Sequence, residues 1–305
     1  MFSMKLENDS GRVVDINDGK KYIVLAVSGL NPPPASIFTA KSPNRKGVKY
    51  NGSTLDARSI VITLKILGDI EANRNALYEW IDTEQYCKVY FKNGAKDVYI
   101  EGHVEDCDVD LFTDNEIINL AILCEDPYFK DMQKIVTEIS AVLKQFAFPF
   151  SISHDQTVTY SSPNPDGSAA TATRNRGVPF STISESNVTN VFNAGAETGA
   201  KIVIRCVGEV KDLCLYDAND TSRQFQINYT FPAGWFIVID TDASPKTCKG
   251  YPPNGGDPVN LLRYLGNIPT WFTLRKGVNA FVYTVDGASA SAEITFNFEN
   301  KYLGV

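Results

Sequence analysis

The stretch Ile60-Val61-Ile62-Thr63-Leu64-Lys65-Ile66 alternates between two kinds of residue along its length. Every second position, beginning with Ile60, is Ile or Leu, whereas the positions between them hold Val, Thr and Lys. Successive side chains of a β-strand point to opposite faces, so one face of this segment is wholly aliphatic. The stretch therefore predicts a strand that lies on a hydrophobic core, and it favours a β-rich fold around it.

The same period of two recurs through the first half of the chain. It is present at Val98 and Ile100, again over 107–111, and in the more apolar run 117–123. One segment differs, because the apolar residues over 69–82 fall at helical spacing among good helix formers. The first half is therefore predicted to be a mainly antiparallel sheet or barrel that carries one helix.

The segment after Asp126-Pro127 permits two interpretations. Its apolar residues between 132 and 146 fit one face of a helix, and those from Ile135 to Leu143 also fit one face of a strand. Both alternatives lead into Phe146-Ala147-Phe148-Pro149-Phe150, whose proline favours an extended crossing between domains.

The second half predicts a β-sandwich. Residues 151–187 are rich in Ser, Thr, Asn and Pro, which indicates loops with short strands. Beyond them, short alternating segments are separated by turn-forming clusters, and no long helical stripe interrupts them. The segments lie at 202–206, 225–229, 281–285 and 294–298. At ~150 residues per domain the length predicts two domains, and we expect them at 1–144 and 145–305.

Composition excludes several functional classes. Of the 305 residues, 43% are hydrophobic and 21% are charged, as in ordinary globular proteins. The net charge of −7 argues against a dedicated nucleic-acid binder, which needs a basic face. No apolar run approaches the ~18 residues of a membrane span. The first residues carry no apolar core of signal-peptide length, so we expect a protein made in a cytoplasm without membrane insertion.

No motif for catalysis or metal binding stands out. The six cysteines include no C-x-x-C, and the two histidines, His103 and His154, are far apart in sequence. The chain has no G-x-S-x-G and no phosphate-binding glycine loop. The acidic run 105–110 lacks the glycine and glutamate of a calcium loop, and its alternation predicts the solvated face of a strand. We therefore expect no catalytic residue, no metal and no cofactor.

Two groups of residues are candidates for binding. Arg45, Lys46 and Lys49 lie in one basic loop, which is a candidate contact to a like subunit of this acidic chain. Trp235 and Trp271 are candidates for stacking on a sugar, although aromatic side chains more often pack in cores. Without a visible active site, the residues favour a structural or binding role over an enzyme.

Eight short motifs, each a turn or the end of a strand, are spread in a fixed order along nearly the whole chain. They are Tyr22–Leu25, Tyr50–Ser53, Arg58–Ile62, Cys124–Phe129, Phe146–Phe150, Asn190–Gly199, Ile239–Thr241 and Leu274–Asn279. This order resembles that of the distal tail proteins (Dit), a family of siphovirus-type phage tail components. None of the motifs is a catalytic signature.

The resemblance implies a structural role. The N-terminal domain would build a homohexameric ring that joins the tail tube to the tip or baseplate, and a galectin-like β-sandwich would project outward. It implies contacts with the tail tube protein, the tail-associated hub or lysin protein and receptor-binding proteins, with no cofactor and no specific nucleic acid. The protein would reside at the virion tail tip after assembly in the host bacterial cytoplasm. The alternative is a carbohydrate- or receptor-binding module of the tail tip, with Trp235 or Trp271 on the sugar.

Overall fold

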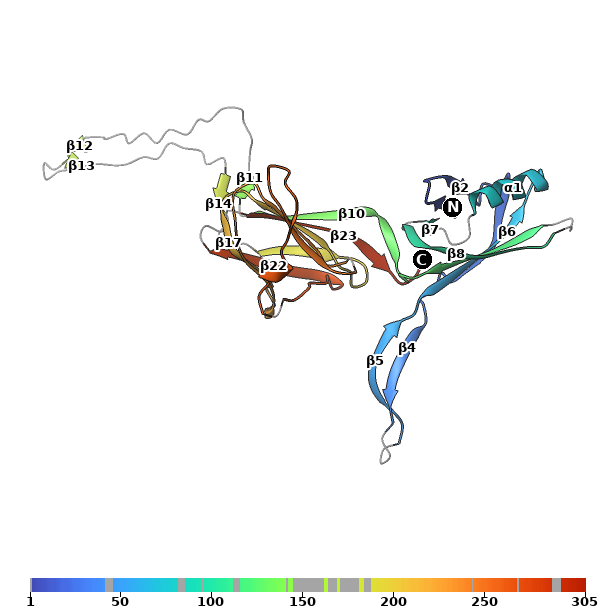
Figure 1. The fold of residues 1–305 in the computed structure, drawn as a ribbon, viewed down its shortest axis with the longest axis horizontal. Helices are drawn as coiled ribbons and strands as arrows, with labels where there is room; N and C mark the ends of the chain where they lie inside the picture. Colours follow the sequence, from blue (N-terminus) through green and yellow to red (C-terminus); the bar gives the residue numbers. More distant parts are fainter. Residues whose placement is uncertain are drawn as a thin grey trace.

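The structure, a computed structural model, has two bodies joined by a two-stranded ribbon (Figure 1). Each body has its own hydrophobic core. The structure describes residues 2–41, 46–81, 86–94, 96–111, 116–140, 142–144, 162–163, 169–170, 181–183, 188–242, 244–267, 269–286 and 292–305.

Antiparallel strands form the sheet of the first body, in the order β2-β1-β7-β8-β9-β6-β3. The strands are β1 (Ser3–Asn8), β2 (Val13–Asp15), β3 (Tyr22–Ser28), β6 (Arg58–Ile66), β7 (Tyr86–Asn93), β8 (Lys96–Val109) and β9 (Ile117–Cys124). β6 contains the alternating stretch, and its Ile and Leu side chains are buried in the first core. The strand predicted from this stretch is confirmed.

Helix α1 (Ile70–Trp80) covers this core, as the spacing over 69–82 predicts. The Asp69 side chain caps the helix by accepting a hydrogen bond from the Ala72 N–H at 3.2 Å. Leu77 and Trp80 are the side chains that the helix buries. The helix ends where Ile81 takes up extended backbone geometry.

A hairpin of β4 (Ala35–Ala40) and β5 (Lys49–Leu55) leaves the first body as an arm (Figure 1). These two strands pair only with each other among the described residues. They do not join the sheet from which they project.

The segment with two interpretations is a strand. β10 (Phe129–Ser140) pairs with β23 (Ala292–Tyr302) from Phe129 opposite Tyr302 to Ser140 opposite Glu293. At its first residues β10 also pairs with β8. Ile135 lies against the second core whereas Val136 is exposed, which is the period of a strand. The helix alternative is wrong, because the segment pairs with β23 in antiparallel register as far as Ser140.

The second body is a sandwich of two antiparallel sheets, as the alternating segments predict. β10 and β23 continue into β16 (Lys201–Cys206), β19 (Phe236–Asp240), β20 (Thr247–Tyr251) and β21 (Val259–Asn260). The facing sheet has the order β15 (Val188–Asn193), β22 (Gly277–Asp286), β17 (Val210–Asp217) and β18 (Asp220–Phe231). Shorter elements are β11 (Val142–Lys144), β12 (Ser162–Pro163), β13 (Ala169–Ala170), β14 (Ser181–Ile183) and the 3-10 turn η1 (Leu262–Tyr264).

The mainly β fold class with one helix is confirmed over the described part of the chain. The core of the second body lies between its two sheets, where Phe281 and Phe296 stack with ring centroids 4.8 Å apart. The predicted crossing at 146–150 lies outside the described residues. The division at 144 and 145 stays a prediction.

The acidic run takes the position predicted for it. Asp106 and Asp108 are exposed at the end of β8, while Cys107 and Val109 between and after them are half-buried against the first core. Across the segments that the structure describes, no helix has the length and apolar character to cross a bilayer.

Candidate functional site: the hairpin arm and the joint

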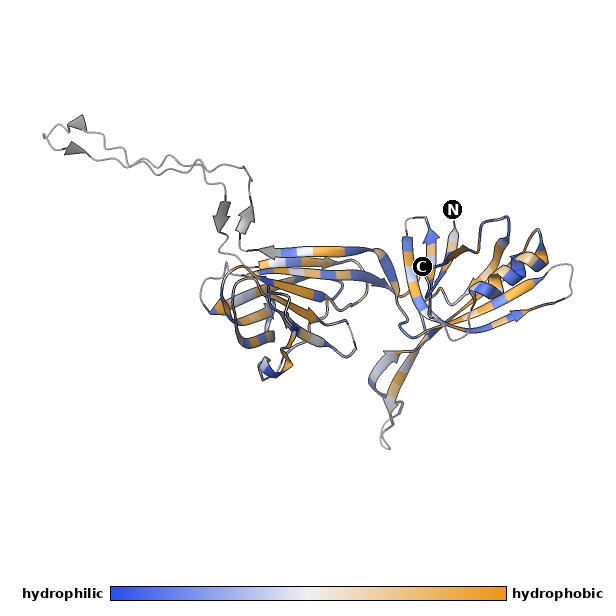
Figure 2. Cartoon of the chain, turned by 45° about the horizontal axis from the view of Figure 1, so that its top comes forward, coloured by the Kyte–Doolittle hydropathy of each residue, from blue (hydrophilic) through white to orange (hydrophobic). Residues whose placement is uncertain are grey.

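The hairpin arm, β4 and β5 with the residues that join them, carries exposed apolar residues. Figure 2 shows hydrophobic colour on its ribbon, which projects away from the first body. Ile37, Phe38, Val48 and Tyr50 are all more than half exposed, with Ile37 at 63%. An isolated two-stranded hairpin is only marginally stable in water, and contiguous exposed apolar surface marks an interaction site. The arm is therefore the strongest candidate for a protein–protein contact in the described part of the chain.

The base of the arm is fixed by Arg58, which is 2% exposed. Its guanidinium donates hydrogen bonds to the backbone carbonyls of Gly29 at 2.6 Å, Asn31 at 2.9 Å and Leu303 at 2.6 Å. It also lies over the Phe129 ring, 4.5 Å from the ring centroid. Burial lowers the pKa of Arg58, yet an arginine stays charged. One cation thus ties the segment before the arm to the start of β10 and the segment after β23.

Two of the three basic residues predicted to touch a neighbouring subunit lie at the end of this arm. Lys46 and Lys49 are exposed. Arg45 lies outside the described residues. Their contact role stays a prediction, but their place on the most exposed element is compatible with it.

A chain of ion pairs crosses the joint between the two bodies. Lys130 on β10 lies 2.6 Å from Glu101 and 3.7 Å from Asp126. Lys301 on β23 lies 3.6 Å from Asp126 and 2.9 Å from Asp242. Since Glu101 and Asp126 belong to the first body and Asp242 to the second, the two lysines connect the bodies electrostatically.

The pKa values at the joint follow from this pairing. Burial raises the pKa of Glu101, but the hydrogen bonds from Lys130 and Tyr86 outweigh it and leave that pKa below its ordinary value. Burial lowers the pKa of Lys130, and the hydrogen bond to Glu101 outweighs this effect, so its pKa is raised. Both groups are held in their charged forms at neutral pH.

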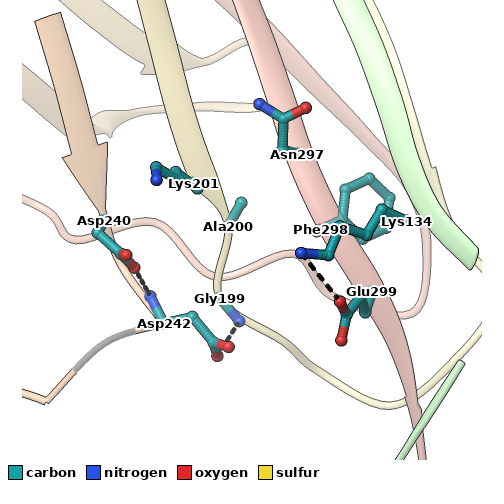
Figure 3. A pocket seen from close by; sticks show the side chains of 9 residues that line it. All are labelled: Lys134, Gly199, Ala200, Lys201, Asp240, Asp242, Asn297, Phe298 and Glu299. Atoms are coloured by element: carbon teal, nitrogen blue, oxygen red, sulfur yellow. Dashed lines mark hydrogen bonds and ion pairs between the residues drawn. The ribbon is translucent and has the colours of Figure 1, made fainter. Parts of the chain in front are cut away.

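A cavity of about 190 Å³ lies beside the joint, on the outer face of the larger sheet (Figure 3). Its polar lining includes Lys134, Lys201, Asp240, Asp242 and Glu299. The Asp242 carboxylate accepts a hydrogen bond from the Gly199 N–H at 3.3 Å, which fixes one side of the opening. The lining suits a hydrated polar ligand more than an apolar one.

The two candidate tryptophans are half-buried and pack in different places. Trp271 stacks edge-on with Phe225 at 5.1 Å, and Trp235 lies 5.9 Å from Phe231. Phe225 and Phe231 are six residues apart on β18, about 20 Å along a strand. The structure therefore does not bring Trp235 and Trp271 to one platform, and the sugar contact of each stays a prediction.

The cysteines and His103, whose side chains can act as nucleophiles or metal ligands, are packed within the fold. Burial raises the pKa of Cys87, Cys124, Cys206 and Cys248 to about 12, so these thiols are protonated at neutral pH. His103 lies edge-on to Tyr86, with ring centroids 5.9 Å apart. Over the residues that the structure describes, no group of three or more His, Cys, Asp and Glu side chains could hold a metal ion.

The predictions from the sequence include neither the exposed arm nor the joint, which is the set of ion pairs that Lys130 and Lys301 form between the two bodies. The arm has a signal, since Ala35-Ser36-Ile37-Phe38-Thr39-Ala40 is rich in strand formers and a basic, Pro-containing loop separates it from the next strand. The joint has none, because Asp126, Lys301 and Asp242 meet only through long-range pairing of β10 with β23.

Comparison with known proteins agrees with this architecture. Residues 10–124 match the family model of the phage tail protein RIFT-related domain. The Dit protein of phage SPP1, described as a paradigm of the hub adsorption apparatus in phages that infect Gram-positive bacteria, has a similar solved structure. Its TM-score is 0.65 at 14% identity, and the match covers 99% of each chain.

Two structures of the phage P2 baseplate in its activated conformation are more distant. The structure with Ca has a TM-score of 0.48 at 13% identity over 100% of both chains. The structure with Sr has a TM-score of 0.44 at 12% identity over 98% of both chains. No curated protein matches the sequence. The resemblance to the distal tail proteins is confirmed at the level of the fold: residues 10–124 match the phage tail protein RIFT-related domain, and the chain as a whole has the fold of the SPP1 Dit protein.

Proposed function

We propose that this protein is a structural subunit of a phage tail tip, in which a homohexameric ring joins the tail tube to the tip or baseplate. The tail-domain match over 10–124 and the SPP1 Dit fold over the whole chain support a hub role.

The observation that carries the proposal is the hairpin arm. Its apolar residues have no cover within the described chain, while Arg58 anchors its base. A second copy of the chain is the occupant that fits, since every subunit of a ring offers an arm to one neighbour and receives one from the other. Such a head-to-tail contact closes into a ring when its rotation completes a turn.

The two bodies would divide the work. The first body, with the arm, would build the ring, and the second body would project from it as the outer sandwich. The tail tube protein would bind above the ring, the tail-associated hub or lysin protein below it, and receptor-binding proteins around it. The net charge of −7 per chain suits a conduit through which DNA passes without adhering.

Electron microscopy and mass photometry of the full chain test this proposal. The wild type is expected to form six-fold rings, and the variant with Ile37→Asp and Phe38→Asp is expected to stay monomeric with an unchanged circular dichroism spectrum and Tm. Phe192→Asp is the matched control, because Phe192 is a 59% exposed phenylalanine on the second body. This control is expected to form rings.

Two outcomes would overturn the proposal. A wild type that stays monomeric at every concentration, also in the presence of its tube and hub neighbours, contradicts the ring. An arm variant that assembles like the wild type contradicts the role of the arm.

A further inference from the structure

The outer face of the larger sheet in the second body presents its side chains in rows across the strands. The aromatic row, fixed by strand register, consists of Glu293, Arg205, Phe236 and Tyr251. The middle row consists of Thr295, Val203, Val238 and Lys249, and the polar row consists of Asn297, Lys201, Asp240 and Thr247. Each row crosses β23, β16 and β19 in that order.

The aromatic row combines two exposed rings with a fixed charge pair. Phe236 is 43% exposed and Tyr251 is 37% exposed, and the two are direct cross-strand neighbours. Arg205 is the cross-strand neighbour of Phe236 on the other side, and its Nη1 lies 3.4 Å from Glu293. These groups complement a sugar ring. Its apolar C–H face can stack on the aromatic rings, and the hydroxyls at its edge can form hydrogen bonds with the charged pair.

The polar row sets an ammonium group between an amide and a carboxylate. Lys201 lies between Asn297 and Asp240 (Figure 3). All three line the cavity of about 190 Å³. The Asp240 carboxylate also accepts a hydrogen bond from the Asp242 N–H at 3.1 Å, which orients it. Donor and acceptor groups alternate along this row, a pattern that complements neighbouring hydroxyls.

The middle row leaves space between the other two. At the centre of this row Val203, Val238 and Thr295 are short and half-buried, whereas the exposed Lys249 stands at its end on β20 and the rows beside it carry long or aromatic side chains. The aromatic and polar rows are four residues apart along each strand, from Lys201 to Arg205 on β16, or about 13 Å. A disaccharide is too short to reach from the cavity to the rings, but a longer oligosaccharide spans both.

We propose that this face binds a neutral oligosaccharide longer than a disaccharide, with one sugar ring stacked on Phe236 and Tyr251 and another held in the cavity by Lys201, Asp240 and Asn297. Because the aromatic row and the polar row each hold both charge signs, the face favours a neutral glycan over a polyanion. The proposal concerns the second body alone and does not depend on the ring.

A printed array of defined neutral oligosaccharides of increasing length tests it on the full-length protein. Binding is expected to begin above disaccharide length. Phe236→Ala is expected to weaken it about tenfold, in line with the loss of one stacking contact, and Lys201→Ala to weaken it similarly. Phe192→Ala, an exposed phenylalanine on the opposite sheet, is the matched control and should bind like the wild type.

A blank array overturns the proposal and leaves the ring proposal untouched. Binding that survives both Phe236→Ala and Lys201→Ala also overturns it. Binding lost in a folded Trp271→Ala variant but kept in Phe236→Ala would place the sugar at the tryptophan instead.

Discussion

The arm and the β10–β23 ribbon are both two-stranded antiparallel elements that leave the first body, yet their surroundings differ (Figure 1). Every residue of β4 is exposed. The ribbon instead begins at Phe129 in the first core and reaches Phe298 and Ile135 at the second. Ion pairs from Lys130, Lys134 and Lys301 lie along it.

This difference shows how one type of element serves two purposes. A hairpin alone is marginally stable, so its conformation depends on what covers it. The ribbon is covered at both ends by cores of its own chain, and it therefore acts as an internal connection. Within the part of the chain that the structure describes, the arm is held at its base alone, and it therefore suits a contact with another chain.

The largest effect is expected from substitution of Arg58, which contacts both elements. Its hydrogen bonds to Gly29 and Asn31 hold the segment before the arm, and its hydrogen bond to Leu303 holds the segment after β23. Arg58→Ala leaves three carbonyls without their donor, and we expect the free energy of unfolding of the first body to fall by about 3 kcal/mol. Denaturant unfolding followed by intrinsic fluorescence measures this change. Arg58→Lys should recover part of the loss, and an unchanged midpoint in Arg58→Ala would show that the base of the arm is held by other contacts.

A smaller effect is expected at the joint. Lys301→Met removes the cation between Asp126 and Asp242, and we expect a loss of about 1–2 kcal/mol. Because this cation connects the two bodies, the radius of gyration from small-angle X-ray scattering should also change. Lys134→Met is the control, since Lys134 is an exposed partner of Glu299 on the same ribbon. Identical scattering in Lys301→Met and the wild type would mean that the strand pairing alone orients the bodies.

Acid should weaken the joint through Glu101. Its pKa is lowered in the folded state, so its stabilisation is present above the unfolded value of about 4.3 and is lost as pH falls through the folded pKa. Glu101→Gln should therefore flatten the dependence of Tm on pH below about pH 5. Differential scanning calorimetry at a series of pH values measures this slope, and parallel curves for variant and wild type would contradict the assignment.

The smallest effect is expected for the acidic run at the end of β8. Asp106 and Asp108 are exposed, and the described residues around them form no metal cluster. Asp108→Asn should change stability by less than about 0.5 kcal/mol. Calcium added to the wild type should leave its Tm unchanged, and a calcium-dependent rise that Asp108→Asn abolishes would show a cation site there.

Patterns within single segments of the sequence are sufficient to predict much of the fold. The alternation at 60–66 predicts β6, because burial on one face imposes a period of two on the sequence. The helical spacing of apolar residues over 69–82 predicts α1. Both are properties of a single segment and the face that it buries.

Features that depend on distant partners were not predictable. The segment at 132–146 fits both periods, and its strand form follows from pairing with β23, far away in sequence. Rows across strands, such as Arg205, Phe236 and Tyr251, depend on register and are invisible until the sheet is assembled. Residue type alone made the two tryptophans the candidates for stacking on a sugar. The exposed rings that are cross-strand neighbours belong instead to Phe236 and Tyr251.

The polypeptide returns to the first body after completing the sandwich, where Tyr302 and Val305 pack on the first core and the Val305 N–H bonds to Leu30. The sandwich is therefore an insertion into one body, entered at Phe129 and left at Tyr302, which are opposite each other in register. A stem with adjacent entry and exit lets the module be exchanged for another without rebuilding its host. Replacement of the whole sandwich would thus leave the hydrophobic core and the arm of the first body in place.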